Sequence, residues 1–574
     1  MKSQAVLGLL LLAATLAAYS PALTNGFIWD DDHHLTENPL VTGPDGLRKI
    51  WTSPEAFYYP LVLTTFWGMN QIWGLAPYPY HLTNILLHAA NALLLWGLLA
   101  RFGLRGGFLA ALIFALHPVQ VESVAWVTEL KNTLSGLFYL LALHAFLSFQ
   151  RSKGNHPGDE GIDGRNETAW YGVALVLSTL ALLSKPSTVM LPVILLAYLL
   201  WSEGRISLRP FLQTAPFFLL SLAASLWTIW EQKHHSMAQG APWDETFLER
   251  LLNAPRIVLF YLGKLLWPHP LSFIYPKWTV DPGVWSSYLA PFACLVLVGI
   301  LMRWRRSWGG PCLIALGYFA VTLFPVLGFF NIYFTVYSYV ADHFQYLACI
   351  GPMALLAHGC ARFWPGSGLG RFVGPVGVGI LALVLGAKTW SQCPIYRNEE
   401  TLWLDVIAKN PSASMAYNNL GIWLSKQGRP REAIPNFERA LELTPEDPEY
   451  HYNLALALGR QAEVARSVEH FEKAIAARPG EARFHNSYAS LLAAVGRIEE
   501  AVGQYERSLE VAPLAPDAAT NREALADLLV RAGRAKEALV QLREAGKIKP
   551  GDPALHSRIA QLESALGLAS TPSP

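Results

Sequence analysis

Long apolar segments recur along the first two thirds of this chain, and they constrain its fold more than any other feature. A helix needs about 20 apolar residues to cross the hydrocarbon core of a bilayer. The sequence predicts eleven spans, at residues 4–23, 80–100, 106–122, 132–149, 168–184, 186–201, 210–230, 285–302, 311–329, 344–361 and 372–391. We therefore expect an all-α, polytopic membrane region over residues 1–392.

The composition agrees with a membrane protein and excludes other classes. Of the 574 residues, 52% are hydrophobic and only 15% are charged. The 44 basic and 43 acidic residues nearly cancel, so bulk charge gives no reason to expect a nucleic-acid partner. The spacing of the five cysteines matches neither a zinc site nor a disulfide framework.

Basic residues in the short loops predict the orientation, because cytoplasmic loops carry an excess of lysine and arginine. With Lys2 in the cytoplasm, all basic clusters of the short loops fall on that same side. These clusters are Arg101 with Arg105, Arg151 with Lys153, Arg205 with Arg209, Arg303 with Arg305 and Arg306, and Arg362 with Arg371. An odd number of spans then places the C-terminal region on the opposite side, which we expect to be the periplasm of a bacterial inner membrane.

Three further segments complete this topology. The apolar N-terminal segment is interpreted as an uncleaved first span rather than a signal peptide, since it is long enough to cross a bilayer. Residues 60–75 and 251–267 are less apolar or shorter than the spans. Counting them as spans would spoil the bias of basic residues, so we expect interfacial or re-entrant helices there.

The C-terminal third repeats with a period of 34 residues. Pro411, Pro445, Pro479 and Pro513 are spaced by 34, and small residues recur in the same phase. This is the signature of the tetratricopeptide repeat (TPR), a pair of helices. We predict a linker or entry helix at 393–411 and a TPR domain at 412–567, with four repeats and a capping helix. Its concave surface would bind a protein or peptide, although a spacer or oligomerisation element is an alternative.

Polar clusters of the membrane region fall in the loops predicted to lie outside. The candidate residues are Asp30, Asp31 and Asp32 in the first loop, His117, Glu122 and Lys131 in the second, Lys185 in the third, and Asp342, His343 and Tyr346 in the fourth. Each has a plain structural alternative, such as a solvated loop, a lysine extending to the interface or a packed histidine. Their gathering at one face favours a functional site.

Carboxylates and lysines at one membrane face fit a particular reaction. A sugar linked to a polyprenyl phosphate presents an anionic leaving group at the membrane surface, which lysine and histidine side chains can bind. A carboxylate can take the proton of the attacking hydroxyl. The chain has no glycine-rich nucleotide-binding loop, which favours a lipid-linked donor.

Several motifs resemble the transmembrane-and-TPR O-mannosyltransferase family of the GT-C glycosyltransferase superfamily. They are Phe27-Ile28-Trp29-Asp30-Asp31 with Asn38-Pro39, Tyr59-Pro60-Leu61, the segment from His81 to His88, the segment from His117 to Glu122, and Ala341-Asp342-His343-Phe344-Gln345-Tyr346. Tyr59 stands where that family has arginine. The order of a membrane region followed by TPRs also matches.

The resemblance implies a GT-C fold and transfer of a sugar from a polyprenyl phosphate to a hydroxyl, with inversion. It implies that Asp30 and Asp31 supply the base or hold a divalent cation, Mg²⁺ or Mn²⁺, without deciding which aspartate is the base. Glu122 is a further acidic candidate. Lys185 takes the position of a phosphate-binding lysine, and Lys131 and His343 are candidates for the same role. Asp32, His117, Asp342 and Tyr346 are further candidate site residues.

The predicted function is transfer of mannose or a similar hexose to an acceptor recruited by the TPRs, most plausibly serine or threonine of a protein. One alternative keeps the chemistry but uses a glycolipid or polysaccharide acceptor. Another is a non-catalytic membrane scaffold that presents the TPRs. A transporter fits less well, since the charges gather at one face instead of the midplane.

Overall fold

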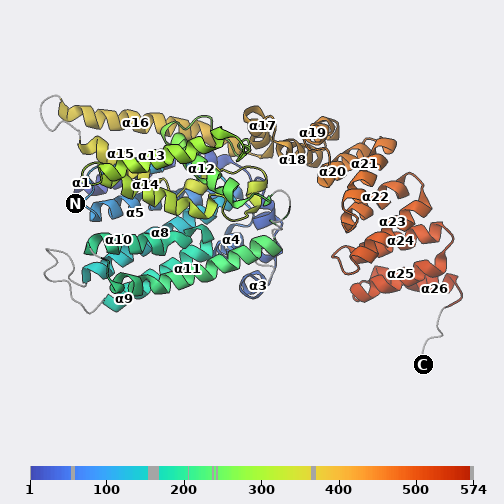
Figure 1. Cartoon of the computed structure of the whole chain (residues 1–574). Coiled ribbons are helices and arrows are strands. Elements are labelled where there is room, and N and C mark those ends of the chain that lie inside the picture. Colours follow the sequence, from blue (N-terminus) through green and yellow to red (C-terminus); the bar gives the residue numbers. More distant parts are fainter. Residues whose placement is uncertain are drawn as a thin grey trace. The chain divides into compact units, whose positions relative to one another are not determined.

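The structure, a computed structural model, describes residues 2–53, 59–152, 167–204, 206–235, 238, 240, 243–362 and 370–568 (Figure 1). Every regular element in these ranges is a helix, which confirms the predicted all-α class. The chain divides into two compact units, Met1–Asn410 and Pro411–Pro574. Lys153 and Arg205, which contributed to the predicted orientation, lie outside the described residues.

Nine helices among the described residues are long and apolar enough to cross a membrane. They contain α1 (Lys2–Tyr19), α5 (Pro77–Arg101), α8 (Leu130–Ser152), α9 (Glu167–Ser184), α10 (Leu191–Glu203), α11 (Leu208–His234), α13 (Leu289–Arg303), α14 (Gly309–Leu323) and α16 (Gly370–Gln392). The helices α4 (Pro60–Trp73) and α12 (Phe247–Leu266) are not among them, in keeping with the interfacial or re-entrant helices expected there.

The predicted span at 106–122 is broken. The helix α6 (Gly107–Leu116) ends before Pro118, and the chain continues through a short turn into α7 (Val121–Ala125) at an angle of 54°. The break follows from the sequence, because a proline disfavours helical backbone at the preceding residue and lacks an N–H group. His117 accordingly has extended backbone. If this bent pair crosses as one span, the described part has ten spans.

The predicted count of eleven spans is not confirmed, and the difference lies at 344–361. Only α15 (Ile350–Arg362) is α-helical there, and its 13 residues are too few to cross a bilayer alone. The preceding residues Asp342–Gln345 form a 3₁₀ turn, η11. Asp342 and His343 are bound to Tyr275 and Glu122, so polar contacts hold this backbone where the apolar sequence alone predicted a helix.

The first and last spans end side by side. The amide of Asn25 donates to the Cys393 carbonyl at 3.1 Å, and the Gly26 N–H donates to the Arg397 carbonyl at 2.8 Å. The loop that follows α1 and the helix α17 (Glu399–Lys409) therefore emerge from the same face of the bundle.

The second unit consists of helix pairs with the predicted repeat. The pairs are α18 (Ser414–Lys426) with α19 (Pro430–Leu443), α20 (Pro448–Arg460) with α21 (Val464–Ala477), α22 (Ala482–Ala494) with α23 (Ile498–Val511), and α24 (Ala518–Arg531) with α25 (Ala535–Ile548), followed by α26 (Pro553–Ala565). In the first pair, a small residue on the first helix faces an aromatic ring of the second. Gly421 contacts Phe437 in this way, and Ala455 and Phe471 are buried at the equivalent positions.

The turn within each pair requires left-handed backbone, and one repeat meets this need with alanine. Gly428 and Gly496 have φ of +73° and +81°, whereas Ala462 takes the same position with φ of +59°. A side chain in this conformation costs about 1–2 kcal/mol. Glycine avoids this cost, but it loses more backbone entropy on folding, which offsets part of the gain. We expect Ala462→Gly to stabilise this repeat by about 0.5–1 kcal/mol, measured by hydrogen exchange of the amides of α20 and α21.

The matched control is Ala476→Gly at an exposed position within α21. It is expected to destabilise the same repeat by about 0.5–1 kcal/mol, because glycine lowers helix propensity. Equal effects of the two substitutions would contradict the assigned strain at Ala462.

Candidate active site at one face of the membrane bundle

The loop after α1 carries the acidic cluster, and its backbone is strained beside the acids. Trp29 has φ of +45°, a conformation that is rare for a residue with a side chain and that often occurs at functional sites. The Trp29 ring stacks on Trp126 with centroids 5.6 Å apart and meets Phe273 edge-on. These aromatic contacts hold the loop in the conformation that presents Asp30.

Asp31 ties this loop to the membrane bundle. Its carboxylate accepts from the N–H of Ile28 at 2.9 Å, from the N–H of Thr128 at 2.8 Å, and from the hydroxyl of Thr128. The side chain is fully buried, and this burial raises the pKa of Asp31 to about 7. With both oxygens occupied by donors of the chain, Asp31 serves to position the loop.

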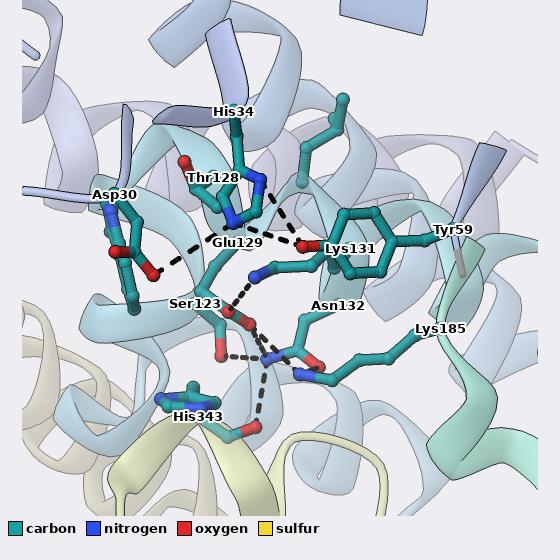
Figure 2. A network of polar contacts seen from close by, with 12 residues as sticks. Asp30, His34, Tyr59, Ser123, Thr128, Glu129, Lys131, Asn132, Lys185 and His343 are labelled. Carbon is teal, nitrogen blue, oxygen red and sulfur yellow. Dashed lines mark hydrogen bonds and ion pairs between the residues drawn. The ribbon is translucent and has the colours of Figure 1, made fainter. Parts of the chain in front are cut away.

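Asp30 is the more accessible carboxylate of the pair. Its side chain is 38% exposed, and its Oδ2 atom lies 4.0 Å from Nε2 of His34. The His34 ring in turn meets the Tyr59 hydroxyl, 3.0 Å from Nε2 (Figure 2). Partial burial raises the pKa of Asp30, and the nearby Lys131 charge opposes this rise. A raised pKa strengthens a carboxylate as a proton acceptor.

Two lysines share one buried carboxylate below this pair. The Nζ atoms of Lys185 and Lys131 lie 3.1 and 3.4 Å from the Glu129 carboxylate. Glu129 belongs to the 3₁₀ turn η4 (Val127–Glu129), and its side chain is only 2% exposed, against 13% and 15% for Lys131 and Lys185. One carboxylate balances one of the two ammonium groups, so the trio keeps one positive charge at the surface of the buried region.

Aromatic rings also border the lysine pair. The Lys131 ammonium group lies 5.2 Å from the centroid of the Tyr59 ring and 5.7 Å from that of Trp126. Such contacts stabilise a cation by the negative face of the ring. Tyr59, which stands where the resembled family has arginine, therefore acts here through Lys131 and His34.

Asn132 connects the separate parts of the cluster. Its side-chain oxygen accepts from Lys185 at 2.8 Å, and its nitrogen lies 2.7 Å from Glu129, 2.9 Å from the Ser123 hydroxyl and 2.9 Å from the His343 carbonyl (Figure 2). Residues from three distant stretches of sequence, 123–132, Lys185 and His343, thus form one continuous polar network.

His343 binds the remaining acidic candidate. Its Nδ1 atom lies 2.7 Å from Oε1 of Glu122, and its backbone N–H donates to Oε2 at 3.2 Å. Burial lowers the pKa of His343 to about 3, so the imidazole is neutral and its Nδ1 atom shares a hydrogen bond with Glu122. This pair orients the turn η11 beside Asn132.

Asp342 points away from the lysines and binds Tyr275. The Tyr275 hydroxyl lies 3.0 and 3.1 Å from the two carboxylate oxygens. Burial raises the pKa of Asp342 to about 7, well above its value of about 3.9 in an unfolded chain. Between about pH 4 and 7 the folded protein therefore holds a proton that the unfolded chain has lost.

This proton predicts a pH-dependent stability. A raised pKa contributes stability at low pH, and the contribution is lost as the pH rises towards 7. We expect thermal unfolding in detergent to show a smaller change in Tm between pH 4.5 and 7.5 for Asp342→Asn than for the natural protein. Equal pH profiles would show that Asp342 is already ionised at pH 4.5.

Three predicted candidates lie outside the lysine network. His117 caps the turn after α6 and contacts the Leu265 carbonyl at 3.1 Å. Tyr346 lies in the bundle interior, where its hydroxyl meets His88 at 2.9 Å and Asn91 at 3.0 Å. Asp32 accepts from the Thr36 hydroxyl within its own loop. Each of the three has a structural partner. This agrees with the structural alternative that the sequence analysis gave for such residues.

The described residues contain no preformed cluster of ligands for a divalent cation. Among the described residues, no three His, Cys, Asp or Glu side chains gather as metal ligands. Three donors already occupy the Asp31 oxygens, which leaves Asp30 as the carboxylate of the pair able to reach an ion. The Mg²⁺ or Mn²⁺ considered above stays a prediction.

The sequence places Glu129 and Asn132 beside Lys131 in the second polar loop, but it predicts no role for them at the site. The only local signal for Glu129 is that its carboxylate lies close in sequence to Lys131. The same pattern occurs at ordinary helix ends. The partner that makes Glu129 central is Lys185, 56 residues away, and no local pattern predicts that contact.

Two protein families match parts of the chain. Residues 59–230 match the family described as dolichyl-phosphate-mannose-protein mannosyltransferase, and residues 419–482 and 488–553 match the tetratricopeptide repeat. The first match includes Glu129, Lys131 and Lys185. The second falls within the helix pairs of the C-terminal unit.

Curated relatives from animals are similar across both parts. The chain is 25% identical to human protein O-mannosyl-transferase TMTC1 over 498 residues, which cover 76% of this chain and 55% of the relative. It is 25% identical to mouse protein O-mannosyl-transferase TMTC3 over 486 residues, which cover 76% of this chain and 51% of the relative. A Caenorhabditis elegans protein O-mannosyl-transferase, F38B6.6, is 22% identical over 466 residues, which cover 77% of this chain and 64% of the relative.

These findings confirm the resemblance to the transmembrane-and-TPR O-mannosyltransferases. The chain spans about half to two thirds of the length of these relatives. The similarity supports a membrane protein of glycosyltransferase type.

Proposed function

We propose that this chain, which joins a mannosyltransferase-like membrane unit to TPR helix pairs, is a glycosyltransferase. It transfers mannose or a similar hexose from a polyprenyl-phosphate donor to a hydroxyl of an acceptor, which we propose to be serine or threonine of a protein. The observation that carries the proposal is the accessible Asp30 carboxylate near the Lys131 and Lys185 ammonium groups, to which His34 and Tyr59 connect it.

The lysine pair is suited to the leaving group. As the bond between the anomeric carbon and the phosphate oxygen breaks, negative charge grows on the phosphate. Lys131 and Lys185 supply one positive charge more than Glu129 neutralises, and they are fixed before the reaction by Glu129 and Asn132. Charges fixed in advance stabilise a transition state without reorganisation.

Asp30 is suited to activate the acceptor. It takes the proton of the attacking hydroxyl while the oxygen forms its bond to the anomeric carbon, and polyprenyl phosphate leaves from the opposite side. The sugar is therefore inverted. Asp31 fixes the loop through Ile28 and Thr128, and His343 with Glu122 orients the turn that contacts Asn132.

We further propose that the site faces the periplasm of a bacterial inner membrane, with the N-terminus in the cytoplasm and the TPR unit in the periplasm. Two observations support this topology. Basic residues of the short loops favour one side. The Asp30 loop and α17 emerge from the same face of the bundle. The TPR helix pairs then recruit the acceptor through their concave surface.

The test is transfer of radiolabelled hexose from polyprenyl-phosphate donors to a cell-envelope extract by the purified protein in detergent. Label in protein supports the proposal and identifies the acceptor class. Label in lipid or polysaccharide shows the same chemistry with another acceptor. An absence of transfer from any donor, under conditions where a related enzyme works, favours a membrane scaffold that presents the TPRs.

A further inference from the structure

The hairpin of α13 and α14 concentrates its charge in one turn. The chain has no acidic residue between Asp281 and Asp342, and its basic residues in that stretch are Arg303, Arg305 and Arg306. All three arginines are exposed, and they lie where the C-terminal end of α13 meets the N-terminal end of α14. The turn therefore carries three positive charges that no acidic residue of the same hairpin neutralises.

Two tryptophans give this turn an aromatic surface. The rings of Trp304 and Trp308 stack with centroids 5.7 Å apart, and the Arg303 guanidinium lies 5.9 Å from the centroid of Trp304. Both tryptophans are exposed. Tryptophan at the ends of spanning helices concentrates at the level of the lipid head groups, where the ring meets hydrocarbon and the N–H meets polar groups. We therefore expect the turn to lie at that level.

The backbone of the turn is fixed by its own hydrogen bonds. The Trp304 carbonyl accepts from the N–H groups of Ser307 at 2.9 Å and of Gly309 at 3.1 Å. A side chain at Gly309 would clash with the Leu301 carbonyl, so glycine permits this close approach. The arginines are thus presented by an ordered turn, and a ligand that binds them does not have to order the backbone first.

Arginines of a neighbouring loop are used differently. Arg101 donates to the His144 carbonyl at 2.8 Å and to the Ser148 hydroxyl at 3.1 Å. Within the described residues, the guanidinium groups of Arg305 and Arg306 have no such hydrogen-bond or ion-pair partner. These two groups are therefore open to an anion from outside the chain.

Lipid surrounds the turn on most sides. The helix α13 is a candidate span, and only 6% of its most apolar stretch is buried within the protein. Phe292, Leu295 and Met302 are exposed along it, and such side chains on a spanning helix contact acyl chains. A phospholipid offers both an anionic head group for the arginines and hydrocarbon for α13, whereas a soluble acidic protein offers only the anionic part.

We propose that the turn of residues 303–308 binds an anionic phospholipid. The phosphate lies against the Arg305 and Arg306 guanidinium groups, which form paired hydrogen bonds with phosphate oxygens, and the acyl chains lie along α13. The turn is at the opposite end of α14 from Thr322, which lines a small cavity together with Asn132 of the polar network. The inference is therefore independent of the proposed function.

A photolabelling experiment tests the lipid without requiring activity. The full chain in mixed detergent and lipid micelles is irradiated with a phosphatidylglycerol that carries a diazirine on its head group, and labelled peptides are identified by mass spectrometry. We expect label in residues 300–310, suppressed by excess phosphatidylglycerol and unaffected by excess phosphatidylcholine or soluble glycerol phosphate.

Three outcomes of this experiment would overturn the proposal. Label that avoids residues 300–310 would show that the turn is not a lipid site. Equal suppression by phosphatidylcholine would show ordinary contact with bulk lipid. Suppression by glycerol phosphate as strong as that by phosphatidylglycerol would show an anion site that needs no bilayer.

A matched pair of double variants tests the arginines. Arg305→Gln with Arg306→Gln removes two charges from the turn, and Arg48→Gln with Lys49→Gln removes two from α3 (Gly46–Thr52), where both residues are also adjacent and exposed. A basic residue at an anionic lipid surface contributes about fivefold in binding. In the first variant, we therefore expect the phosphatidylglycerol concentration for half-maximal labelling of residues 300–310 to rise about 30-fold.

The α3 variant should label as the natural protein does, and both variants should keep its Tm, because the four side chains are exposed. Equal shifts in the two variants would show a general attraction between basic protein and anionic lipid. The assignment to the turn between α13 and α14 would then be wrong, whatever the protein's activity in sugar transfer.

Discussion

Asp30→Asn is expected to lower sugar transfer by about 10²- to 10⁴-fold, the usual effect of removing a general base. Its side chain is 38% exposed, and its Oδ2 atom lies 4.0 Å from Nε2 of His34. Asparagine has the same shape and makes no new buried charge, so the fold should be unchanged. The measurement is kcat with saturating donor, alongside Tm in the same detergent.

Asp31→Asn is expected to act mainly on the fold. The amide nitrogen of asparagine would face either the Ile28 N–H or the donors of Thr128, which now meet carboxylate oxygens. A buried donor without an acceptor costs about 1–3 kcal/mol. This variant should therefore lower Tm and increase hydrogen exchange of residues 28–34. A stable Asp31→Asn protein without activity, together with an active Asp30→Asn protein, would reverse the two roles.

Glu129→Gln is expected to be among the most destabilising single changes in the membrane unit. It would leave the Lys131 and Lys185 ammonium groups side by side without the buried carboxylate between them. Removing one partner of a buried ion pair costs about 3–5 kcal/mol, because a charge stays buried and unpaired. The measurement is urea or thermal unfolding in detergent, followed by the fluorescence of the tryptophans.

A second substitution separates stability from function at this position. Adding Lys185→Met to Glu129→Gln removes one cation, so most of the lost stability should return. Transfer should stay low, because the double variant keeps the net charge of the trio but lacks the Lys185 ammonium group proposed to bind the donor phosphate. If Lys185→Met alone keeps full transfer activity, the lysine pair serves only to pack Glu129 and the phosphate assignment is wrong.

The sequence predicted the repeated helices well because their determinants are local. The 34-residue period places small and large residues in contact within one helix pair, as Gly421 and Phe437 show. The apolar segments likewise located most spans. The exception at 344–361 has a non-local cause, since Tyr275 and Glu122 hold Asp342 and His343 from other parts of the chain.

The candidate site was only partly predictable for the same reason. Composition and loop position identified Asp30, Lys131 and Lys185, but hydrogen bonds across the fold distinguish Asp30 from Asp31. The decisive contact for Asp31 is with Thr128, 97 residues away. Similarly, Lys131 and Lys185 could be named from the sequence, whereas their common partner Glu129 emerged only when the spans were packed together.

The contacts of Asn25 with Cys393 and of Gly26 with Arg397 have a consequence for biosynthesis. A ribosome makes the acidic loop early, yet the backbone that fixes the base of that loop is made more than 360 residues later. The nascent protein can insert its first helices while the loop is still unanchored at this point. Once the last span is complete, Cys393 and Arg397 can bind Asn25 and Gly26. A chain interrupted before residue 393 would carry the acidic residues but lack the hydrogen bonds that fix the base of their loop.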